Sequence, residues 1–348
     1  MKIILVYGGQ SPEHEVSIMS AYAILQAIFY SYYEVTPVYI QKNGRFKIGD
    51  VLHEAPTEMD SLRLLQQAEV EPTSLYQPEA LVFPCLHGPN GEDGTFQGFL
   101  ETLNMPYVGC GVLASACGMD KIVTKNLMLQ AGIPQVPFVP VIQDIWKENP
   151  RAIFERIEGA LLYPMYVKPA NMGSSVGITR VEDRESLQKA LGQAFQFDRR
   201  VIVEQGIDAR EIEVALLGNH EVRTSLPGEV KKPVDFYDYQ TKYENQDVEL
   251  VIPAVLAPET QEKVLQYAKQ AYQILAATGL SRCDFFVTNS GEVFFNEINT
   301  MPGFTPKSMY PALWQERGLS YGDLIEELIQ LGLNRFRQKQ ERQQSLTK

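Results

Sequence analysis

Residues 3–17 read IILVYGGQSPEHEVS, and this stretch decides the fold. Ile3 to Tyr7 is a continuous apolar run, which is typical of a strand buried on both faces of a sheet. Two glycines end the strand, and residues 16–29 then have the apolar spacing of a helix. Because a second strand is predicted at residues 34–40, the chain opens with a β-α-β unit of an open parallel sheet.

The length of 348 residues exceeds what one hydrophobic core usually supports, so we expect two or three packed units. Strand and helix patterns continue along the chain, which predicts an α/β (α+β) protein. Residues 44–75 are polar and irregular, with one helix predicted near residues 58–68. The last helix leads into the charged segment 335–348, which we expect to fray because chain ends make few contacts.

The composition argues against several classes of protein. A net charge of −12 disfavours a general nucleic-acid binder, because a phosphate backbone requires a basic face. No run of 18 or more apolar residues is present, and the first apolar run is too short for a secretory signal. The four cysteines have the spacing of neither a CxxC pair nor a disulfide framework. We therefore expect a cytoplasmic protein that binds neither nucleic acid nor membrane.

Two strands are predicted around Asn289-Ser290-Gly291, a hairpin turn signal. Glu297 and Asn299 share one face of the second strand, and the turn brings Asp284 across from them. Oxygen ligands without His or Cys suit Mg²⁺ or Mn²⁺ and not Zn²⁺. The alternative is a solvated hairpin edge, but phenylalanines surround these carboxylates, and burying an unpaired carboxylate is costly. We therefore favour a metal site, and such ions usually also hold substrate phosphates.

The small-residue loop Gly173-Ser174-Ser175-Val176-Gly177 follows a strand predicted at residues 164–168. Glycines let the backbone approach a phosphate, although such a loop alone is more often a simple turn. It is not a Walker A loop, because GxxxxGK[ST] is absent from the chain. Lys168 and Lys125 are plausible partners of one anion, although each lysine alone is usually a solvated surface charge.

Three further carboxylates lie at or near the ends of predicted strands. Glu204 ends an apolar strand and suits an adenine amino group or a ribose hydroxyl, and Glu211 follows after a short loop. Glu15 lies between a strand end and a helix, where open α/β sheets bind ligands, and it suits an amino-acid ammonium group. Glu15 equally suits the dipole of that helix, and the other two are as readily caps or solvated residues.

Together, these motifs resemble those of the D-alanine–D-alanine ligases of the ATP-grasp superfamily. The resemblance extends over about residues 3–335. Each piece alone is weak, but seven pieces in the order of the family are specific. The matching segments are residues 8–17, 86–94, 119–121, 167–177, 236–243, 282–284 and 296–303.

The resemblance implies a three-domain ATP-grasp fold whose N-terminal domain contains an open parallel sheet. The domains that we expect are residues 1–118, 119–205 and 206–340. ATP would lie between the second and third domains, and the D-alanines would lie at the junction with the first. A homodimer is also expected from the resemblance.

The resemblance also implies roles for individual residues. The ATP-binding residues would be Lys125, Lys168, Ser175, Glu204, Gln205, Ile207, Glu211 and Lys242. The ligands of two Mg²⁺ or Mn²⁺ ions would be Asp284, Glu297 and Asn299, with K⁺ a candidate monovalent cation. The catalytic residues would be Glu15, Ser174, Tyr243, Arg282 and Gly303. The residues near the substrate carboxylates would be His87, Ser308 and Met309.

In the implied reaction, the carboxylate of one D-alanine attacks the γ-phosphate of ATP, and the amine of a second D-alanine attacks the resulting acyl phosphate. Arg282 and the Gly303 N–H would form the oxyanion hole. Glu15, linked to Ser174 and Tyr243, would bind the first ammonium group. Residues around 237–243 would form a lid that excludes water. The dipeptide would supply peptidoglycan synthesis.

Two alternatives remain open at this point. The first is a D-alanine–D-lactate ligase, but Tyr243 resembles the dipeptide-forming members, and Phe or His there would indicate lactate. The second is a catalytically silent nucleotide-binding regulator, against which the presence of Arg282, Asp284 and both lysines argues. Gln205 stands where many members carry Lys, so only its backbone is expected to contact adenine.

Overall fold

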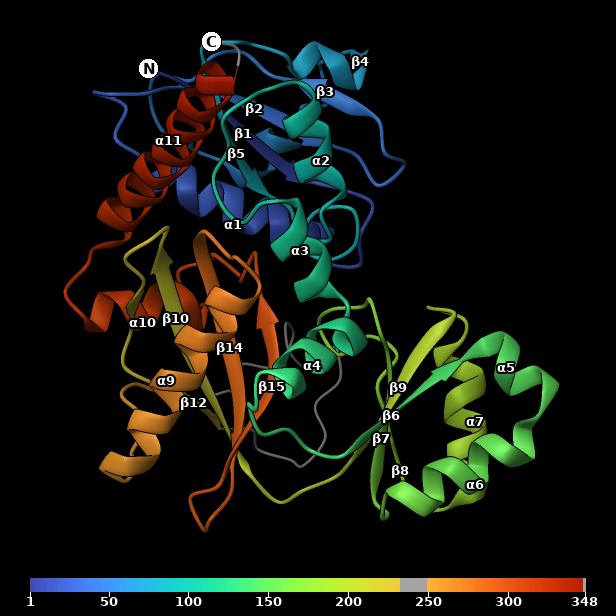
Figure 1. Ribbon diagram of the computed structural model, residues 1–348. Helices are drawn as coiled ribbons and strands as arrows, with labels where there is room; N and C mark the ends of the chain where they lie inside the picture. The colour runs from blue at the N-terminus through green and yellow to red at the C-terminus, as the bar shows by residue number, and fades with distance from the viewer. Residues whose placement is uncertain (232–248, 347–348) are drawn as a thin grey trace.

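The computed structural model describes residues 1–231 and 249–346, which fold around three β-sheets (Figure 1). The first sheet has the strand order β4-β3-β2-β1-β5. Its parallel strands are β1 (Lys2–Gly8), β2 (Glu34–Ile40) and β5 (Ala80–Cys85). Every residue of β1 after Lys2 is buried, as the apolar run predicts for a strand with neighbours on both sides. The predicted open parallel sheet is therefore confirmed for these three strands, and β3 and β4 extend it as antiparallel strands.

Residues 44–75 differ from the prediction. They form β3 (Phe46–Ile48), a 3₁₀ helix (Met59–Arg63), β4 (Glu69–Val70) and a second 3₁₀ helix (Pro72–Leu75). The α-helix predicted near residues 58–68 is wrong, because Leu62 is the buried residue of that turn and Leu64 ends it with a φ of 47°. One apolar side chain does not provide the stripe that would hold a longer helix against a core.

The helices of the first unit are α1 (His14–Ala27), α2 (Thr95–Thr102) and α3 (Val112–Met119). Helix α4 (Lys121–Gln130) then leads to the second unit. Asp120 caps α4 by accepting a hydrogen bond of 2.9 Å from the Val123 N–H, which fixes where that helix begins.

The second sheet has the order β6-β9-β7-β8, and its helices lie together on one side (Figure 1). Its strands are β6 (Phe138–Ile142), β7 (Met165–Pro169), β8 (Thr179–Val181) and β9 (Arg200–Gln205). Its helices are α5 (Gln143–Glu148), α6 (Pro150–Ala160) and α7 (Arg184–Ala194). Val167 and Val203 pack in the core that α6 and α7 share. Because side chains alternate along a strand, Lys168 and Glu204 point to the other face.

The third sheet has the order β13-β12-β10-β14-β15, with β11 beside β10. Its strands are β10 (Arg210–Gly218), β11 (Arg223–Thr224), β12 (Gly228–Lys231), β13 (Glu249–Val251), β14 (Gly279–Val287) and β15 (Val293–Asn299). Strands β14 and β15 pair antiparallel, which confirms the predicted hairpin. Helix α9 (Pro258–Ile274) packs on one face of this sheet, and the other face carries apolar side chains such as Leu217 as well as polar ones such as Asp284.

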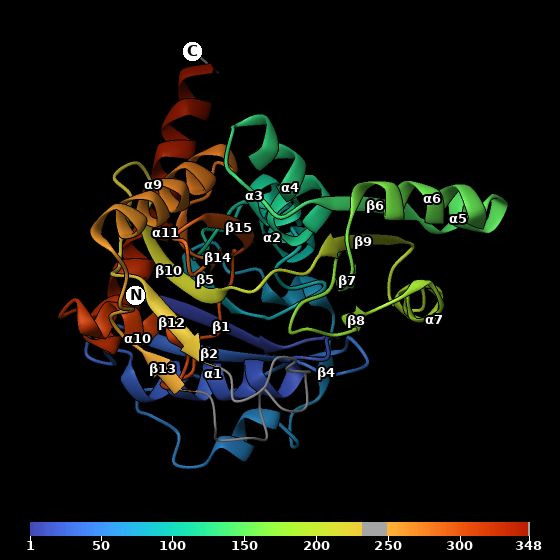
Figure 2. The same cartoon turned by 90° about the horizontal axis from the view of Figure 1, so that it is seen from below.

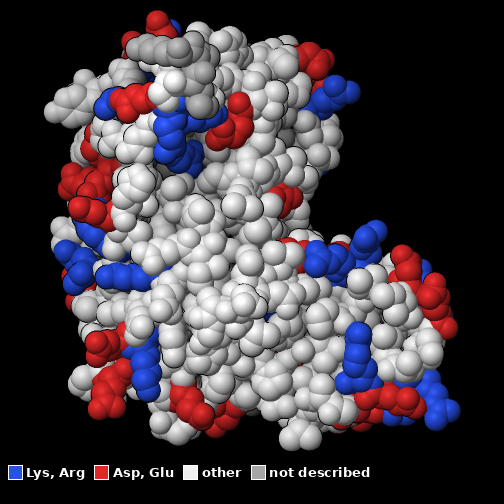
Figure 3. All heavy atoms as spheres, in the orientation of Figure 1, with Lys and Arg blue, Asp and Glu red and all other residues white. Residues whose placement is uncertain are grey.

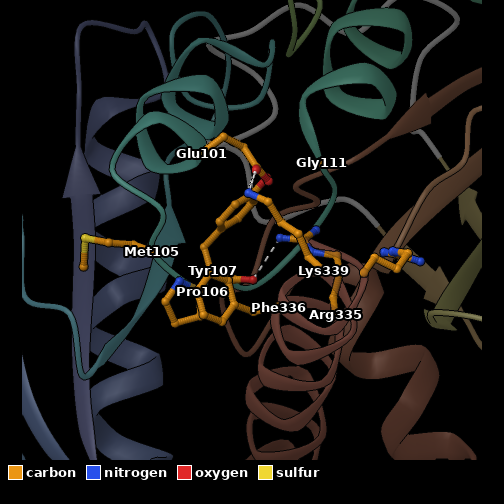
Figure 4. A pocket seen from close by; sticks show the side chains of 9 residues that line it. Glu101, Met105, Pro106, Tyr107, Gly111, Arg335, Phe336 and Lys339 are labelled. Atoms are coloured by element: carbon orange, nitrogen blue, oxygen red, sulfur yellow. Dashed lines mark hydrogen bonds and ion pairs between the residues drawn. The ribbon is translucent and has the colours of Figure 1, made fainter. Parts of the chain in front are cut away.

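Helices α10 (Met309–Glu316) and α11 (Tyr321–Leu346) complete the chain. The fraying predicted from residue 335 is wrong, because α11 continues to Leu346 and its side chains are bound to the first unit (Figure 4). The Arg335 guanidinium lies 4.1 Å from the centre of the Tyr107 ring and donates to the carbonyl oxygens of Tyr107 and Gly109. Lys339 forms an ion pair with Glu101. These contacts give the charged tail partners that its composition does not reveal.

The first unit, which is the first sheet with α1 to α3, and the third unit, which is the third sheet with α9 and α10, share one hydrophobic cluster. This cluster includes Tyr7 of β1, Leu217 of β10 and Leu328 of α11. The second unit has a core of its own and projects from this body, as seen from below in Figure 2. Figure 3 shows a hollow between the projecting unit and the first unit. Among the described residues, no helix is both long and apolar enough to cross a membrane.

Candidate active site

A buried carboxylate joins two lysines on the open face of the second sheet. Glu204 at the end of β9 lies 3.1 Å from Lys125 Nζ of α4 and 2.5 Å from Lys168 Nζ of β7. The three residues are 2%, 1% and 8% exposed, respectively. The sequence suggested adenosine contacts for Glu204, whereas in the structure its carboxylate holds both predicted phosphate-binding lysines in place.

The charges of this cluster favour an anionic ligand. Burial raises the pKa of Glu204, but the two neighbouring ammonium groups outweigh burial and lower this pKa to about 2. Burial lowers the pKa of Lys125, and the charge of Lys168 lowers it further. Because one carboxylate offsets only one of two cations, the cluster retains a positive charge that suits a phosphate.

The predicted phosphate loop connects the cluster to the third sheet. Ser174 and Ser175 both have positive φ, 49° and 61°, and Gly177 has a φ of 73°. Consecutive left-handed residues turn their N–H groups into a concave anion site, and non-glycine residues in this conformation are strained in ways typical of functional sites. Lys121 donates to the Met172 carbonyl over 2.7 Å and lies 3.6 Å from Glu297. It therefore connects the loop to the hairpin of β14 and β15, called the metal hairpin because the predicted metal ligands lie on it.

The link from Ser174 to the first unit goes to Glu13 and not to Glu15. The Ser174 hydroxyl donates to Glu13 Oε1. Glu15 instead lies on the exposed side of α1, 3.0 Å from Lys42 and 2.9 Å from Arg63, and the hydrogen bond from Arg63 lowers its pKa to about 2. The predicted link between Glu15 and Ser174 is therefore wrong. Glu13 immediately precedes α1 and faces the loop, whereas the first helical turn carries Glu15 to the outside.

Two glycines make room for the Glu13 carboxylate. A Cβ atom on Gly88 would lie 2.8 Å from Glu13 Oε2, and one on Gly173 would lie 3.0 Å from the same oxygen. A side chain at either position would therefore displace the carboxylate. The sequence motif contains both Glu13 and Glu15, and only the start of α1 distinguishes them.

Glu92 is a second carboxylate in this region to which the sequence assigned no role. Its Oε1 atom accepts a hydrogen bond of 2.9 Å from the Gly88 N–H. Burial raises the pKa of Glu92 to about 8, and the charges of Glu13 and Glu297 add to the effect. Its place in the glycine-rich loop at residues 87–94 was the available signal.

The predicted substrate residues lie at the junction of the first and third units. His87 is buried, with Nδ1 3.1 Å from the Met301 carbonyl oxygen and Nε2 3.1 Å from Ser20 Oγ. Ser308 precedes Met309, the first residue of α10, but its hydroxyl does not cap that helix and instead accepts a hydrogen bond of 3.1 Å from the Thr305 N–H. A Cβ on Gly303 would lie 3.0 Å from Ser308 Oγ, which places Gly303 next to the same helix start.

The metal hairpin has the register that the sequence predicts. Asp284 of β14 lies opposite Glu297 of β15, and Arg282 lies opposite Asn299. Two Arg282 nitrogens lie 2.8 Å from the two Asp284 carboxylate oxygens, and Asn299 Nδ2 lies 3.0 Å from Asp284 Oδ2. Burial raises the pKa of Asp284, and the facing charge of Glu297 raises it further, against the opposing effect of Arg282. Two facing carboxylates repel each other, and a hard cation between them would offset that repulsion.

These donors are suited to a metal ion only together with other ligands. Within residues 1–231 and 249–346, no group of three His, Cys, Asp or Glu side chains could hold a metal ion. Two carboxylates and the Asn299 amide leave positions for phosphate oxygens, as Mg²⁺ sites with nucleotides usually do. Lys168 Nζ lies 6.0 Å from the centre of the Phe286 ring on β14, so the lysine cluster and the hairpin adjoin each other.

The remaining predicted residues fall into two groups. Gln205, Ile207 and Glu211 lie where the chain passes from β9 to β10, and the Gln205 N–H donates to the Pro137 carbonyl over 3.0 Å. The Gln205 side chain accepts from the Leu162 N–H. The predicted lid residues Lys242 and Tyr243 lie outside the described residues.

Comparisons with known proteins identify the family of this chain. The D-Ala D-Ala ligase N-terminus matches residues 2–110, and the D-ala D-ala ligase C-terminus matches residues 127–330. The D-alanine–D-alanine ligase of Enterococcus hirae is 59% identical to this chain over 351 aligned positions, which cover 98% of each chain. That of Bacillus cytotoxicus is 47% identical over 353 positions, again covering 98% of each.

Solved structures give the same result. The D-alanine–D-alanine ligase of Coxiella burnetii superimposes with a TM-score of 0.87 at 32% identity, covering 99% of this chain and 97% of its own. The VanG D-Ala:D-Ser ligase of Enterococcus faecalis has a TM-score of 0.83 at 35% identity, covering 95% and 99%. The sequence and fold comparisons thus agree, and the chain belongs to the D-alanine–D-alanine ligase family.

Proposed function

We propose that this chain joins two molecules of D-alanine into D-alanyl-D-alanine at the expense of ATP. The observation that favours this function is the meeting of three units at one place. The Glu13–Ser174 hydrogen bond joins the first unit to the phosphate loop, and the His87–Met301 contact joins the first unit to the third. Candidate groups for an ammonium, a carboxylate and a phosphate therefore come from units that contact one another.

In the proposed reaction, a carboxylate oxygen of the first D-alanine forms a bond to the γ-phosphorus, and ADP leaves. The amine of the second D-alanine, after losing a proton, then attacks the acyl phosphate carbonyl, and inorganic phosphate leaves as the amide forms. Lys125 and Lys168 hold the phosphates during the first step. Arg282 and the Gly303 N–H stabilise the oxyanion of the second step, so the protein acts mainly by positioning and charge.

The two amino acids are held by different elements. The Glu13 carboxylate, fixed by Ser174, binds the ammonium group of the first D-alanine. Ser308 and the Met309 N–H bind the carboxylate of the second D-alanine, because the N-terminus of α10 carries free N–H groups and a positive dipole end. We assign His87 to these carboxylates, and the role of Tyr243 stays the one that the family resemblance implies.

ATP is the co-substrate. Glu211 and the backbone at Gln205 and Ile207 hold its adenosine part. Ser175 and Lys242 are assigned to its phosphates. Asp284, Glu297 and Asn299 would hold two Mg²⁺ or Mn²⁺ ions, which supply charge neutralisation for the phosphates. K⁺ is a candidate activator. We further propose a cytoplasmic homodimer that supplies peptidoglycan precursors, with domains at residues 1–118, 119–205 and 206–340.

The test of this function is phosphate release by the purified chain with ATP and Mg²⁺. D-alanine should give steady phosphate release and a dipeptide detectable by mass spectrometry, and L-alanine should give neither. A mixture of D-alanine and D-lactate at neutral pH should yield mainly dipeptide. Absence of phosphate release that depends on D-alanine would support the silent regulator, and a depsipeptide product would support the lactate ligase.

The two glutamates before and within α1 should differ in their effect on catalysis. Glu13→Gln is expected to lower kcat/KM for D-alanine by about 10- to 100-fold, because a hydrogen bond to a charged group contributes about 1.5–3 kcal/mol. Glu15→Gln, the matched control, should retain the wild-type value, because Glu15 forms exposed ion pairs with Lys42 and Arg63. Initial rates over a range of D-alanine concentrations measure both. Equal losses in the two variants would contradict the assignment of Glu13.

A further inference from the structure

Glu213 of β10 extends the metal hairpin into a row of three carboxylates. In the register of the sheet, Glu213 lies opposite Asp284 of β14, which in turn lies opposite Glu297 of β15. Residues directly opposite each other share one face of a sheet, so the three side chains lie side by side. Glu213 is only 9% exposed, so its charge requires a partner.

That partner is Arg282, which Glu213 shares with Asp284. Arg282 Nε lies 2.8 Å from Glu213 Oε2 and 2.8 Å from Asp284 Oδ1. A second Arg282 nitrogen lies 2.8 Å from Asp284 Oδ2. The two carboxylates therefore meet at the Nε atom of Arg282. Because the guanidinium is planar and its donors are fixed relative to one another, contacts with both carboxylates define its position better than a contact with one.

The two carboxylates are not equivalent in the proposed reaction. Asp284 is a proposed metal ligand, and a carboxylate that shares its oxygens with a divalent cation attracts a neighbouring guanidinium less strongly. Glu213 lies one strand farther from Glu297 and Asn299, the other proposed ligands. The ion pair between Glu213 and Arg282 is therefore the one that persists when the metal site is filled.

We propose that Glu213 is a positioning residue that keeps the Arg282 guanidinium aimed at the reacting carbonyl while Asp284 is shared with the metal. This inference rests on the proposed function, because Arg282 has an oxyanion to stabilise only if acyl transfer occurs. The sequence did not indicate this role, since Glu213 and Arg282 are 69 positions apart along the chain.

The test removes the charge of the Glu213 side chain and keeps its shape. Glu213→Gln should lower kcat by about 10- to 100-fold, which is typical when an outer partner of a metal site is removed, with little change in KM for ATP. Glu213→Asp, which restores the charge on a shorter side chain, should recover part of the lost kcat. A purely structural role would lower the melting temperature without this separation of kcat from KM.

A second readout is independent of turnover. Binding of Mn²⁺ in the presence of ADP, followed by the electron paramagnetic resonance signal of free Mn²⁺, should weaken by about tenfold or more in Glu213→Gln. The reason is that Asp284, whose two oxygens Arg282 already contacts, is then the only one of the two carboxylates left to pair with the guanidinium, which competes more strongly with the ion for these oxygens.

Glu229→Gln is the matched control. Glu229 is 7% exposed and pairs with Arg210 over 2.6 Å, in the same sheet. It lies opposite the buried Ile212, so it is on the other face from Glu213. Turnover and Mn²⁺ binding should stay at the wild-type values in this variant.

Wild-type kcat and Mn²⁺ binding in Glu213→Gln would overturn the proposal, as would equal losses in Glu213→Gln and Glu229→Gln. If Glu213→Gln does not fold, the test uses Glu213→Asp. Wild-type kcat and Mn²⁺ binding in that variant would show that the position of the carboxylate at residue 213 does not matter, which would contradict the proposal. Failure of the proposed function is a separate outcome, because the wild-type chain would then release no phosphate with D-alanine while the Mn²⁺ measurement could still be made.

Discussion

Arg282→Lys is expected to lower the turnover number for dipeptide synthesis by about 10²- to 10³-fold, which is the usual loss when one oxyanion donor is removed. Lysine keeps the positive charge but loses the planar fork that contacts both Glu213 and Asp284. Its ammonium can approach one carboxylate, and the position of the charge relative to the reacting carbonyl then changes. Quenched-flow measurement of phosphate and dipeptide formation gives the rate of the chemical step.

The matched control for Arg282→Lys is Arg210→Lys. Arg210 forms a comparable two-nitrogen pair with Glu229 in the same sheet, at 2.9 and 2.6 Å. This variant should retain the wild-type turnover number, and both variants should retain the wild-type KM for ATP. A turnover number in Arg282→Lys within a factor of two or so of wild type would show that the guanidinium has no special role in the reaction.

Glu204→Gln should destabilise the protein more than any of the other substitutions considered, by about 3–5 kcal/mol. The reason is that Lys125 and Lys168 would remain buried beside each other without the carboxylate that both contact. Urea denaturation followed by circular dichroism measures the effect, and added ATP should recover part of the loss, since its phosphates replace the missing negative charge.

The same carboxylate gives a pH dependence with a defined sign. The pKa of Glu204 is lowered from its ordinary value of 4.5 to about 2 in the folded protein. Its contribution to stability is therefore complete above pH 4.5 and is lost as the pH falls toward 2. In Glu204→Gln, the difference in urea midpoint from wild type should shrink over that interval.

Glu158→Gln is the control for both measurements. Glu158 pairs with Arg184 in the same unit, but the Arg184 side chain is 59% exposed. Exposed pairs contribute about 0–1 kcal/mol, so the urea midpoint should change little. A similar loss of stability in Glu158→Gln and Glu204→Gln would show that burial of the two lysines is not what makes Glu204 important.

Much of the fold could be predicted from local patterns. The apolar run at Ile3 to Tyr7 predicts a strand buried on both faces, because the need to bury each side chain is a property of the strand itself. The hairpin prediction placed Asp284, Glu297 and Asn299 on one face, because side chains alternate with a period of two. These features depend on residues that are close in sequence, and the structure has them as predicted.

The neighbours of each site residue could not be predicted in the same way. Glu13 and Glu15 are two positions apart in one motif. Glu13 is the one that contacts Ser174, 161 positions away, because α1 begins between the two glutamates and the loop at Ser174 approaches that point. Helix α11 is likewise fixed by Tyr107 of a distant segment. The sequence alone thus determined the strands, the hairpin and the kinds of ligand, because these follow from local periodicity and side-chain chemistry. Tertiary structure decided which charges meet, because contact between distant segments depends on how the three units pack.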